Sequence, residues 1–196
     1  MKIELKIVDF LARNIDKKFT INELSKAIKE YYSFVHRTVS KLVKDGVISK
    51  AKAGKAYLCT LNLENEKTLA LIQLGEIEKR NEFYERNKEV KLILEDFVKS
   101  VETHPSVLSI ILFGSYSKGN AAKESDIDVL ILSKSSINIE KTTKEMYAKY
   151  GKEINPILMT TSDFKKQKDK AVIKEIINSH HVLHGVENFA GLVFRK

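Results

Sequence analysis

Two apolar runs, joined by a glycine-serine turn and an acidic pair, constrain the fold of this chain more than any other segment. The first run, Val107–Phe113, is rich in valine and isoleucine and predicts a buried strand. It leads directly into residues 114–119, with the sequence GSYSKG, which suits a strand that turns into a helix. Residues 126–128, with the sequence DID, follow, and Val129–Leu132 then predicts a second strand.

This arrangement of residues is suited to phosphate chemistry. Gly114 lets the backbone approach a ligand closely, and the start of a helix presents free N–H groups to a phosphate. Ser115 adds a hydroxyl donor at the same place. Asp126 and Asp128 are two apart on a strand, so both carboxylates are expected on one face, with Ile127 on the opposite, buried face. Two such carboxylates favour Mg²⁺, and a metal beside a phosphate seat predicts phosphoryl or nucleotidyl transfer.

The segment resembles the signature of the nucleotidyltransferase superfamily that includes DNA polymerase beta, above all its minimal archaeal and bacterial members. The resemblance covers about residues 104–196 and implies a small mixed sheet with helices on one side. It also implies a nucleoside triphosphate, most simply ATP, and up to two Mg²⁺ ions. The residues on motif positions are Gly114, Ser115, Gly119, Asp126 and Asp128. Asp126 and Asp128 would be the catalytic and metal-binding residues, and Gly114, Ser115, Lys118 and Gly119 would hold the nucleotide, with Tyr116 and Lys118 flanking the triphosphate or merely exposed.

One position departs from the family pattern. The family usually places a third carboxylate on the next strand, expected here around residues 153–159, where it helps to hold metal and activates the acceptor hydroxyl. That position holds Asn155, and a neutral amide is a weak metal ligand and a poor base. Glu153 is expected on the same face but two residues away, and Pro156 indicates an edge or bulged strand. Two interpretations therefore stay open, an active transferase and a domain that is catalytically weak or dead.

The first 63 residues have a different pattern. Helical spacing of apolar residues predicts helices near residues 3–11, from Thr20 onward, and from about Ser33 to Gly46. Thr20 and Glu23 form a predicted capping box. Strand-like residues 47–50 and 56–61 then flank a basic tip and predict a β-hairpin. The order of these elements resembles the winged helix-turn-helix, which implies DNA binding; a solvated face or a protein-docking module is the alternative. The implied DNA-contacting residues are Arg37, Ser40, Lys41, Lys44, Lys50, Lys52 and Lys55.

Charge divides the chain in the same way. The net charge is +8 over 196 residues. Residues 1–63 carry 13 basic and 6 acidic side chains, residues 64–103 carry 7 and 10, and residues 104–196 carry 14 and 10. We expect an α+β protein with three parts: a winged helix (1–63), a helical connector (64–103) and a nucleotidyltransferase domain (104–196). The basic excess favours polyanionic partners.

Composition excludes several classes of protein. The single cysteine rules out a disulfide framework and a cysteine-rich zinc site. No apolar run is long enough to span a bilayer, and the N-terminus has no signal-peptide pattern, so a cytoplasmic protein is expected. Three histidines between residues 180 and 184 suggest a metal cluster at first sight, but no carboxylate or cysteine completes the set.

Three functions remain open at the level of sequence. The first is an active nucleotidyltransferase; some minimal members adenylylate a HEPN-type toxin and act as antitoxins. The second is a DNA-binding transcription regulator whose C-terminal domain is catalytically weak or dead and senses nucleotide or dimerises. The third, an RNA-modifying transferase, ranks last because no long RNA-binding domain is present. A homodimer is compatible with each of them.

Overall fold

The computed structural model describes residues 1–54 and 56–195, so Lys55 of the predicted DNA-contacting set lies outside the described residues. The chain divides into two compact units. The N-terminal unit comprises Met1–Glu78 and the chain end from Phe194, and the C-terminal unit comprises Lys79–Val193. The boundaries expected from the sequence, after residues 63 and 103, stay predictions.

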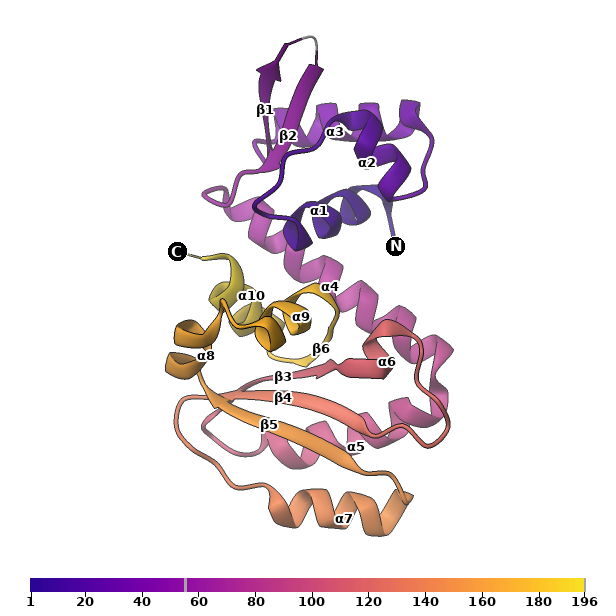
Figure 1. The fold of residues 1–196 in the computed structure, drawn as a ribbon, viewed down its shortest axis with the longest axis vertical. Helices are drawn as coiled ribbons and strands as arrows, with labels where there is room; N and C mark the ends of the chain where they lie inside the picture. Colours follow the sequence, from indigo (N-terminus) through magenta and orange to yellow (C-terminus); the bar gives the residue numbers. More distant parts are fainter. Residues whose placement is uncertain (55, 196) are drawn as a thin grey trace. The chain divides into compact units, whose positions relative to one another are not determined.

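In the described part of the N-terminal unit, three helices precede a two-stranded antiparallel hairpin (Figure 1). The predicted capping box is present: Thr20 Oγ1 accepts from Glu23 N at 3.2 Å, and the Glu23 carboxylate accepts from Thr20 N at 2.7 Å. Gly46, with φ of +73°, follows the third helix as predicted. The elements are α1 Ile3–Arg13, α2 Ile21–Ala27, α3 Tyr32–Lys44, β1 Ile48–Ala53 and β2 Ala56–Leu61. Their inward faces are fully buried at Ile7, Val8, Leu24, Val35, Val39 and Leu42.

The predicted helical segment consists of α4 (Glu66–Arg86) and α5 (Lys88–Glu102). Helix α4 runs through Gly75 without a break, and the two helices separate at Asn87. The predicted apolar stripe of α5 is buried in the core of the C-terminal unit, where Leu94, Phe97 and Val101 pack against strand residues. This second helix is therefore part of that core and not only a connector. No helix among the described residues combines the length and the apolar character needed to cross a membrane.

Within the described residues, the C-terminal unit contains a four-stranded mixed sheet with the strand order β5-β4-β3-β6. Strands β4 and β5 are parallel, whereas β3 pairs antiparallel with both β4 and β6. The mixed α+β architecture expected from the sequence is confirmed. The elements are β3 Val107–Phe113, α6 Gly114–Lys118, β4 Ile127–Ser133, α7 Glu140–Tyr150, β5 Ile154–Thr160, α8 Thr161–Gln167, α9 Ala171–Asn178, β6 His181–His184 and α10 Val186–Phe194.

Helices cover both faces of this sheet, so the expectation of helices on one side is wrong. Helices α5 and α7 lie against one face, and α8, α9 and α10 lie on the opposite side near one end of the strands (Figure 1). Both faces of the central strands are apolar and buried. Ile110 and Val129 face α5 and α7, and Ile111 and Leu130, which alternate with them, are fully buried on the opposite face. The part of the second face near the start of β4 carries polar side chains instead.

Candidate functional site

The glycine-serine turn lies where β3 becomes the short helix α6. Gly114 has φ of +72°, a conformation that residues with a side chain rarely adopt. A Cβ atom at this position would overlap the carboxylate of Asp128, whose Cγ would be only 3.0 Å away. Phe113 pairs directly with Asp128 across the two strands, and this pairing sets the close approach. The turn and the Asp128 carboxylate are therefore in close contact, and their use as one nucleotide site stays a prediction.

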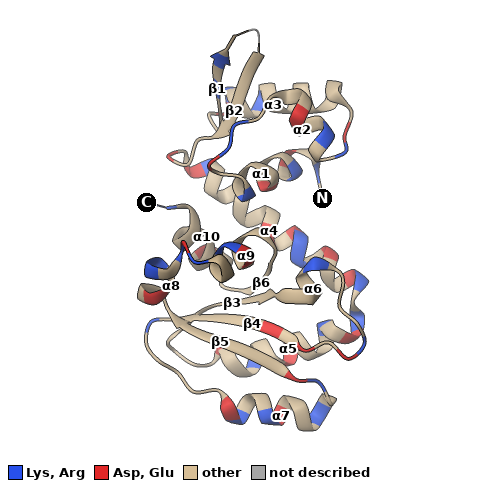
Figure 2. Ribbon diagram, in the orientation of Figure 1, with Lys and Arg blue, Asp and Glu red and all other residues tan. Residues whose placement is uncertain are grey.

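The two carboxylates lie where β4 begins. Figure 2 shows this part of the strand, next to α6, as an acidic stretch. Asp126 is exposed just before the strand, and Asp128 is half-buried. Ile127 and Val129 are fully buried in the core on the opposite face, as predicted. Burial raises the pKa of Asp128 above its ordinary value, and the negative charge of Asp126 raises this pKa further. Both causes disfavour the ionised form of the Asp128 carboxyl.

Asn155 lies beside both carboxylates. Strands β4 and β5 run parallel with Asp128 opposite Asn155, and the Asn155 side chain donates from Nδ2 to Asp126 Oδ2 at 3.3 Å. This is the position at which the resemblance places a third carboxylate. Glu153 precedes β5 with its side chain exposed, and its backbone carbonyl accepts from Ile127 N at 2.9 Å. Pro156 is in β5, which is an edge strand of the sheet, as the proline indicated.

The donor set fits a magnesium ion. Carboxylate oxygens are the ligands that Mg²⁺ prefers, and it is usually held by one or two of them together with substrate phosphates. The position of Asp126 and Asp128 beside the Gly114 turn is the observation that favours a cation here. A bound positive charge would also relieve the repulsion from Asp126 that helps to raise the pKa of Asp128. Asp126 and Asp128 would hold the ion, and its charge would neutralise the phosphates of a nucleotide.

The remaining predicted nucleotide-binding residues lie on α6 and just after it. Ser115 is half-buried in the first turn of α6. Lys118 forms an ion pair with Glu175 of α9. Gly119, with φ of +71°, ends the helix. Tyr116 does not flank a ligand: it is 8% exposed and packs in the core with α5, because the periodicity of this short helix turns it inward.

Sequence reasoning missed the residues that hold α6 in place. The Ser117 hydroxyl lies 3.0 Å from the carbonyl oxygen of Gly114 and 3.0 Å from that of Ser179. It therefore links the glycine-serine turn to the segment after α9. Glu175, the partner of Lys118, comes from the same region. These contacts join positions about 60 residues apart, and no local pattern in the sequence indicates them.

The three histidines after α9 point to different surroundings. His180 is buried, with Nδ1 2.9 Å from the carbonyl oxygen of Ile176. The ring of His181 stacks on Phe83 with centroids 4.6 Å apart. His184 Nδ1 lies 3.0 Å from a carboxylate oxygen of Glu102. As β6 is a strand, the three side chains do not converge on one point.

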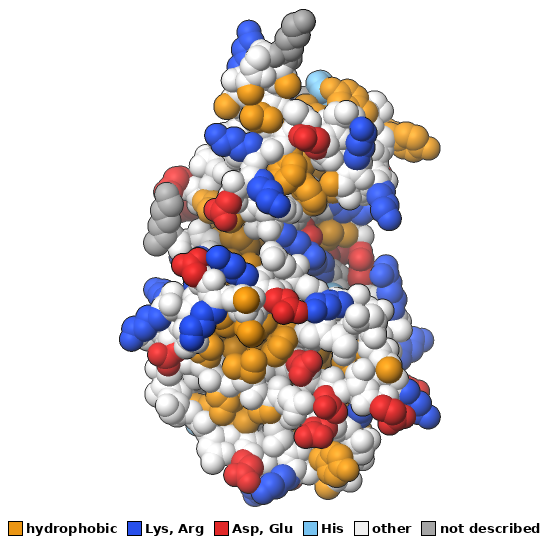
Figure 3. Space-filling view, in the orientation of Figure 1, with side chains coloured by type: hydrophobic (Ala, Val, Ile, Leu, Met, Phe, Trp, Pro, Cys, Tyr) orange, Lys and Arg blue, Asp and Glu red, His pale blue; other side chains and the backbone are white. Residues whose placement is uncertain are grey.

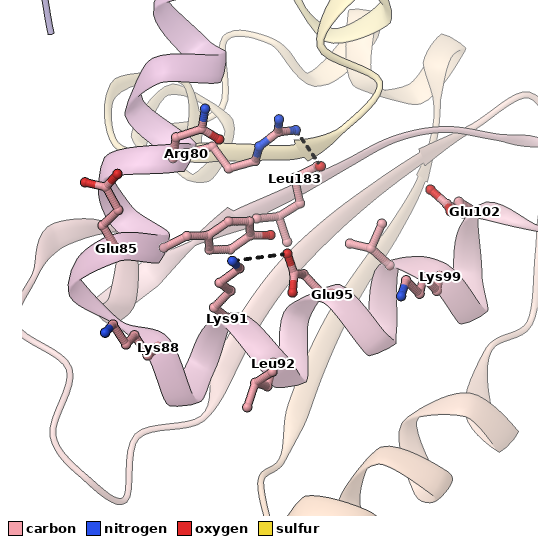
Figure 4. Close-up of a pocket in the computed structure, with 12 residues that line it drawn as sticks. Arg80, Glu85, Lys88, Lys91, Leu92, Glu95, Lys99, Glu102 and Leu183 are labelled. Atoms are coloured by element: carbon pink, nitrogen blue, oxygen red, sulfur yellow. Dashed lines mark hydrogen bonds and ion pairs between the residues drawn. The ribbon is translucent and has the colours of Figure 1, made fainter.

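A large open groove of about 890 Å³ lies between α4 and α5, away from the predicted site (Figure 4). Arg80 donates from Nη1 to the Leu183 carbonyl oxygen at 3.0 Å on one wall, and Lys91 pairs with Glu95 at 3.7 Å on another. Burial raises the pKa of Tyr84 to about 12. None of Gly114, Ser115, Asp126 or Asp128 lines this groove.

The predicted DNA-contacting residues lie on α3 and β1 of the N-terminal unit. Helix α3 carries Arg37, Lys41 and Lys44 and no acidic residue. Its basic side chains are exposed, although Lys41 lies 3.7 Å from Glu4. Lys52 is exposed on β1. The Ser40 hydroxyl donates to the His36 carbonyl oxygen of its own helix at 2.8 Å, and Lys50 lies over the Tyr57 ring at 5.2 Å.

The sequence reasoning did not single out the exposed aromatic side chains beside these lysines. Tyr31 is 78% exposed, and Tyr32, Phe34 and Tyr57 are also exposed. Arg37 lies over the Phe34 ring at 5.7 Å. Figure 3 shows hydrophobic side chains among basic ones on the surface of this unit. Their signal in the sequence was the aromatic cluster at the start of α3, which does not continue the apolar stripe of that helix.

Comparison with known proteins decides the family. The sequence model of the nucleotidyltransferase domain matches residues 75–184, more than half of the chain. This chain belongs to the nucleotidyltransferase domain family. The matched range contains the glycine-serine turn, both aspartates and Asn155. It extends further toward the N-terminus than the expected boundary at residue 104 and includes α5.

Similar nucleotidyltransferase-family proteins occur in Methanocaldococcus jannaschii. "Putative protein adenylyltransferase MJ1305" is 30% identical over 107 residues, which cover 50% of this chain and 73% of that protein. MJ0604 and MJ0141 carry the same description; each is 32% identical, over 46% and 50% of this chain and 94% and 98% of their own lengths. A solved structure described as "Crystal structure of the toxin-antitoxin with AMP-PNP" is a distant likeness, with 17% identity and a TM-score of 0.39 over 55% of this chain and 79% of that one.

Proposed function

We propose that the C-terminal unit binds ATP with Mg²⁺ and transfers AMP to a hydroxyl group on a protein. The observation that carries this proposal is the contact between the Gly114 turn and Asp128, which joins a phosphate seat to an acidic pair. Membership in the nucleotidyltransferase family supports the transfer reaction. The description of three relatives as protein adenylyltransferases supports ATP as donor and a protein as acceptor.

Each residue of the site has a separate part in this reaction. The backbone at Gly114 and Ser115 would bind the β- and γ-phosphates, because free N–H groups at the start of a helix suit anions. Asp126 and Asp128 would hold the metal. Its positive charge would attract the phosphates of the nucleotide and would stabilise the negative charge that develops during transfer. Lys118 would contact the triphosphate only after leaving Glu175. The acceptor oxygen would form a bond to the α-phosphorus while the bond from that phosphorus to pyrophosphate breaks, and the hydroxyl proton would pass to solvent.

A transfer assay tests the proposal. The full chain is incubated with Mg²⁺, ATP labelled at the α-phosphate and cell lysate, and label on protein is measured. Asp126→Asn and Asp128→Asn should each reduce labelling at least roughly 10²-fold, because the metal would lose a charged ligand. Glu145→Gln, which changes an exposed carboxylate on α7, should leave the labelling unchanged. Equal labelling by the aspartate variants and the unchanged chain would contradict the proposal.

We infer a second function, DNA binding, for the N-terminal unit. Three helices followed by a hairpin have the order of a winged helix-turn-helix, and α3 has only basic charges. In this proposal α3 enters the major groove and the hairpin contacts backbone phosphates. The protein would then act as a transcription regulator, either with an active transferase unit or with one that is weak because Asn155 replaces a carboxylate.

Binding to random-sequence DNA, measured by fluorescence anisotropy, tests this second function. Lys41→Ala combined with Lys44→Ala removes two exposed cations from α3 and should weaken binding at least roughly ten-fold at low salt. Lys141→Ala with Lys144→Ala removes the same charge from exposed positions on α7 and is the matched control. If both double variants weaken binding equally, net charge alone is responsible and α3 is not the DNA-contacting helix.

The family resemblance also implies protein partners. A HEPN-type toxin as the acceptor, an antitoxin role and a homodimer remain predictions from the sequence. The acceptor can be identified by recovering the labelled protein from the transfer assay.

A further inference from the structure

Asn155 places a hydrogen-bond donor where the metal site would otherwise gain another acceptor. Its Nδ2 lies 3.3 Å from Asp126 Oδ2, and its strand position is directly opposite Asp128. An amide nitrogen carries two N–H donors and no acceptor. With Nδ2 facing Asp126 in this way, a cation on this side of Asp126 would meet donor hydrogens, and the amide would have to leave this hydrogen bond to present its oxygen.

The charges around the site agree with this reading. Asp126 and Asp128 together carry two negative charges, which one divalent cation balances. Lys152 adds a positive charge nearby, because its ammonium group donates to the Ser125 carbonyl oxygen at 3.1 Å and also to the carbonyl oxygen of Lys123. Glu153 lies just before β5 with its side chain exposed. Among the described residues, no group of three or more His, Cys, Asp and Glu side chains is placed to hold a metal ion, so a second divalent ion would have no further carboxylate ligand from that part of the chain.

We propose that this site holds one divalent cation, bound by Asp126 and Asp128 with the nucleotide, and that the amide of Asn155 takes the place of a second ion. The proposal rests on the proposed function for the presence of the nucleotide. It assigns Asn155 a positioning role: the amide orients the Asp126 carboxylate through its hydrogen bond. Activation of the acceptor hydroxyl then lacks a protein carboxylate at this position.

Counting bound manganese ions tests the proposal. Mn²⁺ replaces Mg²⁺ as the probe, and an ATP analogue with a methylene bridge between the α- and β-phosphates prevents turnover. Free Mn²⁺ is measured by electron paramagnetic resonance while the ion is added to the chain with one equivalent of analogue. The unchanged chain should bind one ion per complex. Asn155→Asp should bind two, with the second ion bound roughly ten-fold or more tightly than by the unchanged chain.

Two further variants separate the causes. Asn155→Ala removes the donor without adding charge and should still bind one ion, whereas Glu153→Gln should not change the count. Two ions on the unchanged chain would overturn the proposal, and their loss in Glu153→Gln would assign the second site to Glu153. No added ion in Asn155→Asp would also overturn it.

The same experiment distinguishes this proposal from the proposed function. A chain that binds no analogue contradicts both. A chain that binds the analogue with two ions contradicts only the single-cation site, and transfer activity can still be present. Under the proposal, Asn155→Asp should also raise adenylyl transfer roughly 10²-fold, because a carboxylate can accept the proton of the acceptor hydroxyl. An ion count of one with unchanged transfer in this variant would overturn the assignment of Asn155.

Discussion

Gly114 and Asp128 lie closer together than a side chain on residue 114 would permit. Gly114 has a left-handed backbone conformation, and the Asp128 carboxylate occupies the space that a side chain on residue 114 would need. The sequence named the glycine, the serine and the two aspartates from their spacing and from the family resemblance, and their role at a site stays a prediction. The hydrogen bond from Asn155 to Asp126 was not predictable, because it depends on the parallel register of β4 and β5. A short sequence gives no information on that register.

The Gly114 contact predicts an unusually costly alanine substitution. Gly114→Ala should lower the free energy of unfolding by about 1–3 kcal/mol, from backbone strain and the overlap with Asp128. Gly151→Ala is the matched control, because Gly151 has φ of +63° and open space around it. It should cost only the backbone part, about 1 kcal/mol. Urea denaturation measures both, and equal losses would show that the contact with Asp128 is unimportant.

The raised pKa of Asp128 predicts a stability change that depends on pH. In the folded chain this carboxyl is harder to ionise than in the unfolded chain, so its ionisation opposes folding. Asp128→Asn should therefore raise Tm at pH 7 without added metal. The gain should shrink as the pH falls toward roughly 4, where the carboxyl is also protonated in the unfolded chain. Thermal unfolding followed by circular dichroism at several pH values measures this.

Asp96→Asn provides the control with the opposite sign. Hydrogen bonds from Lys149 and Tyr150 lower the pKa of Asp96, so its ionised form supports folding. This support is present above the ordinary carboxyl pKa and is lost as the pH falls through the lowered value. Asp96→Asn should lower Tm at pH 7. A lower Tm for Asp128→Asn than for the unchanged chain at the same pH would contradict a raised pKa of Asp128.

At the scale of single elements, helices and strands were predicted correctly where the evidence lay in residues close together in the sequence. The capping box at Thr20 and the strand on each side of the glycine-serine turn lie where spacing predicted them. Gly75 does not interrupt α4, because a glycine inside a long helix costs only about 1 kcal/mol and packing elsewhere outweighs this cost. Helix α8 is capped by Thr160, which is also the last residue of β5, and not by Ser162, two residues further on.

The cap of α8 can be tested by a pair of substitutions. Thr160 Oγ1 accepts from Asp163 N at 3.1 Å and donates to the Asp163 carboxylate at 2.7 Å. Thr160→Ala should lower the free energy of unfolding by about 1 kcal/mol, as expected for a lost cap. Ser162→Ala should change it by less than about 0.5 kcal/mol. Denaturant unfolding of the two variants measures the difference. A larger loss of stability for Ser162→Ala would show that Ser162, and not Thr160, caps α8.

At the scale of the whole molecule, the net charge of +8 is unevenly distributed. The sequence predicted two polyanions for two parts of the chain, and family membership now supports a nucleotide for one of them. The extent of the C-terminal unit was not predictable. The apolar stripe of α5 is visible in the sequence, but nothing in the stripe says which surface it packs against.

Salt dependence tests the expected polyanion of the N-terminal unit. If the predicted lysines and arginine all contact phosphates, the logarithm of the DNA-binding constant should fall with the logarithm of salt concentration with a slope of about −5. Removing Lys41 and Lys44 together should reduce the magnitude of that slope by about 2, because two fewer counterions are released. Anisotropy titrations at several salt concentrations measure it. A slope near zero would exclude phosphate contacts.

The two outer strands of the mixed sheet have a consequence for how copies of the protein behave at high concentration. An open strand edge offers unpaired backbone groups to a neighbouring molecule and can seed aggregation. Strand β5 carries Pro156, which has no N–H to offer. On β6 the Leu183 carbonyl is already bonded to Arg80. Each edge therefore has one backbone position closed to pairing, so intermolecular strand addition is disfavoured. Arg80→Ala would reopen one of these positions.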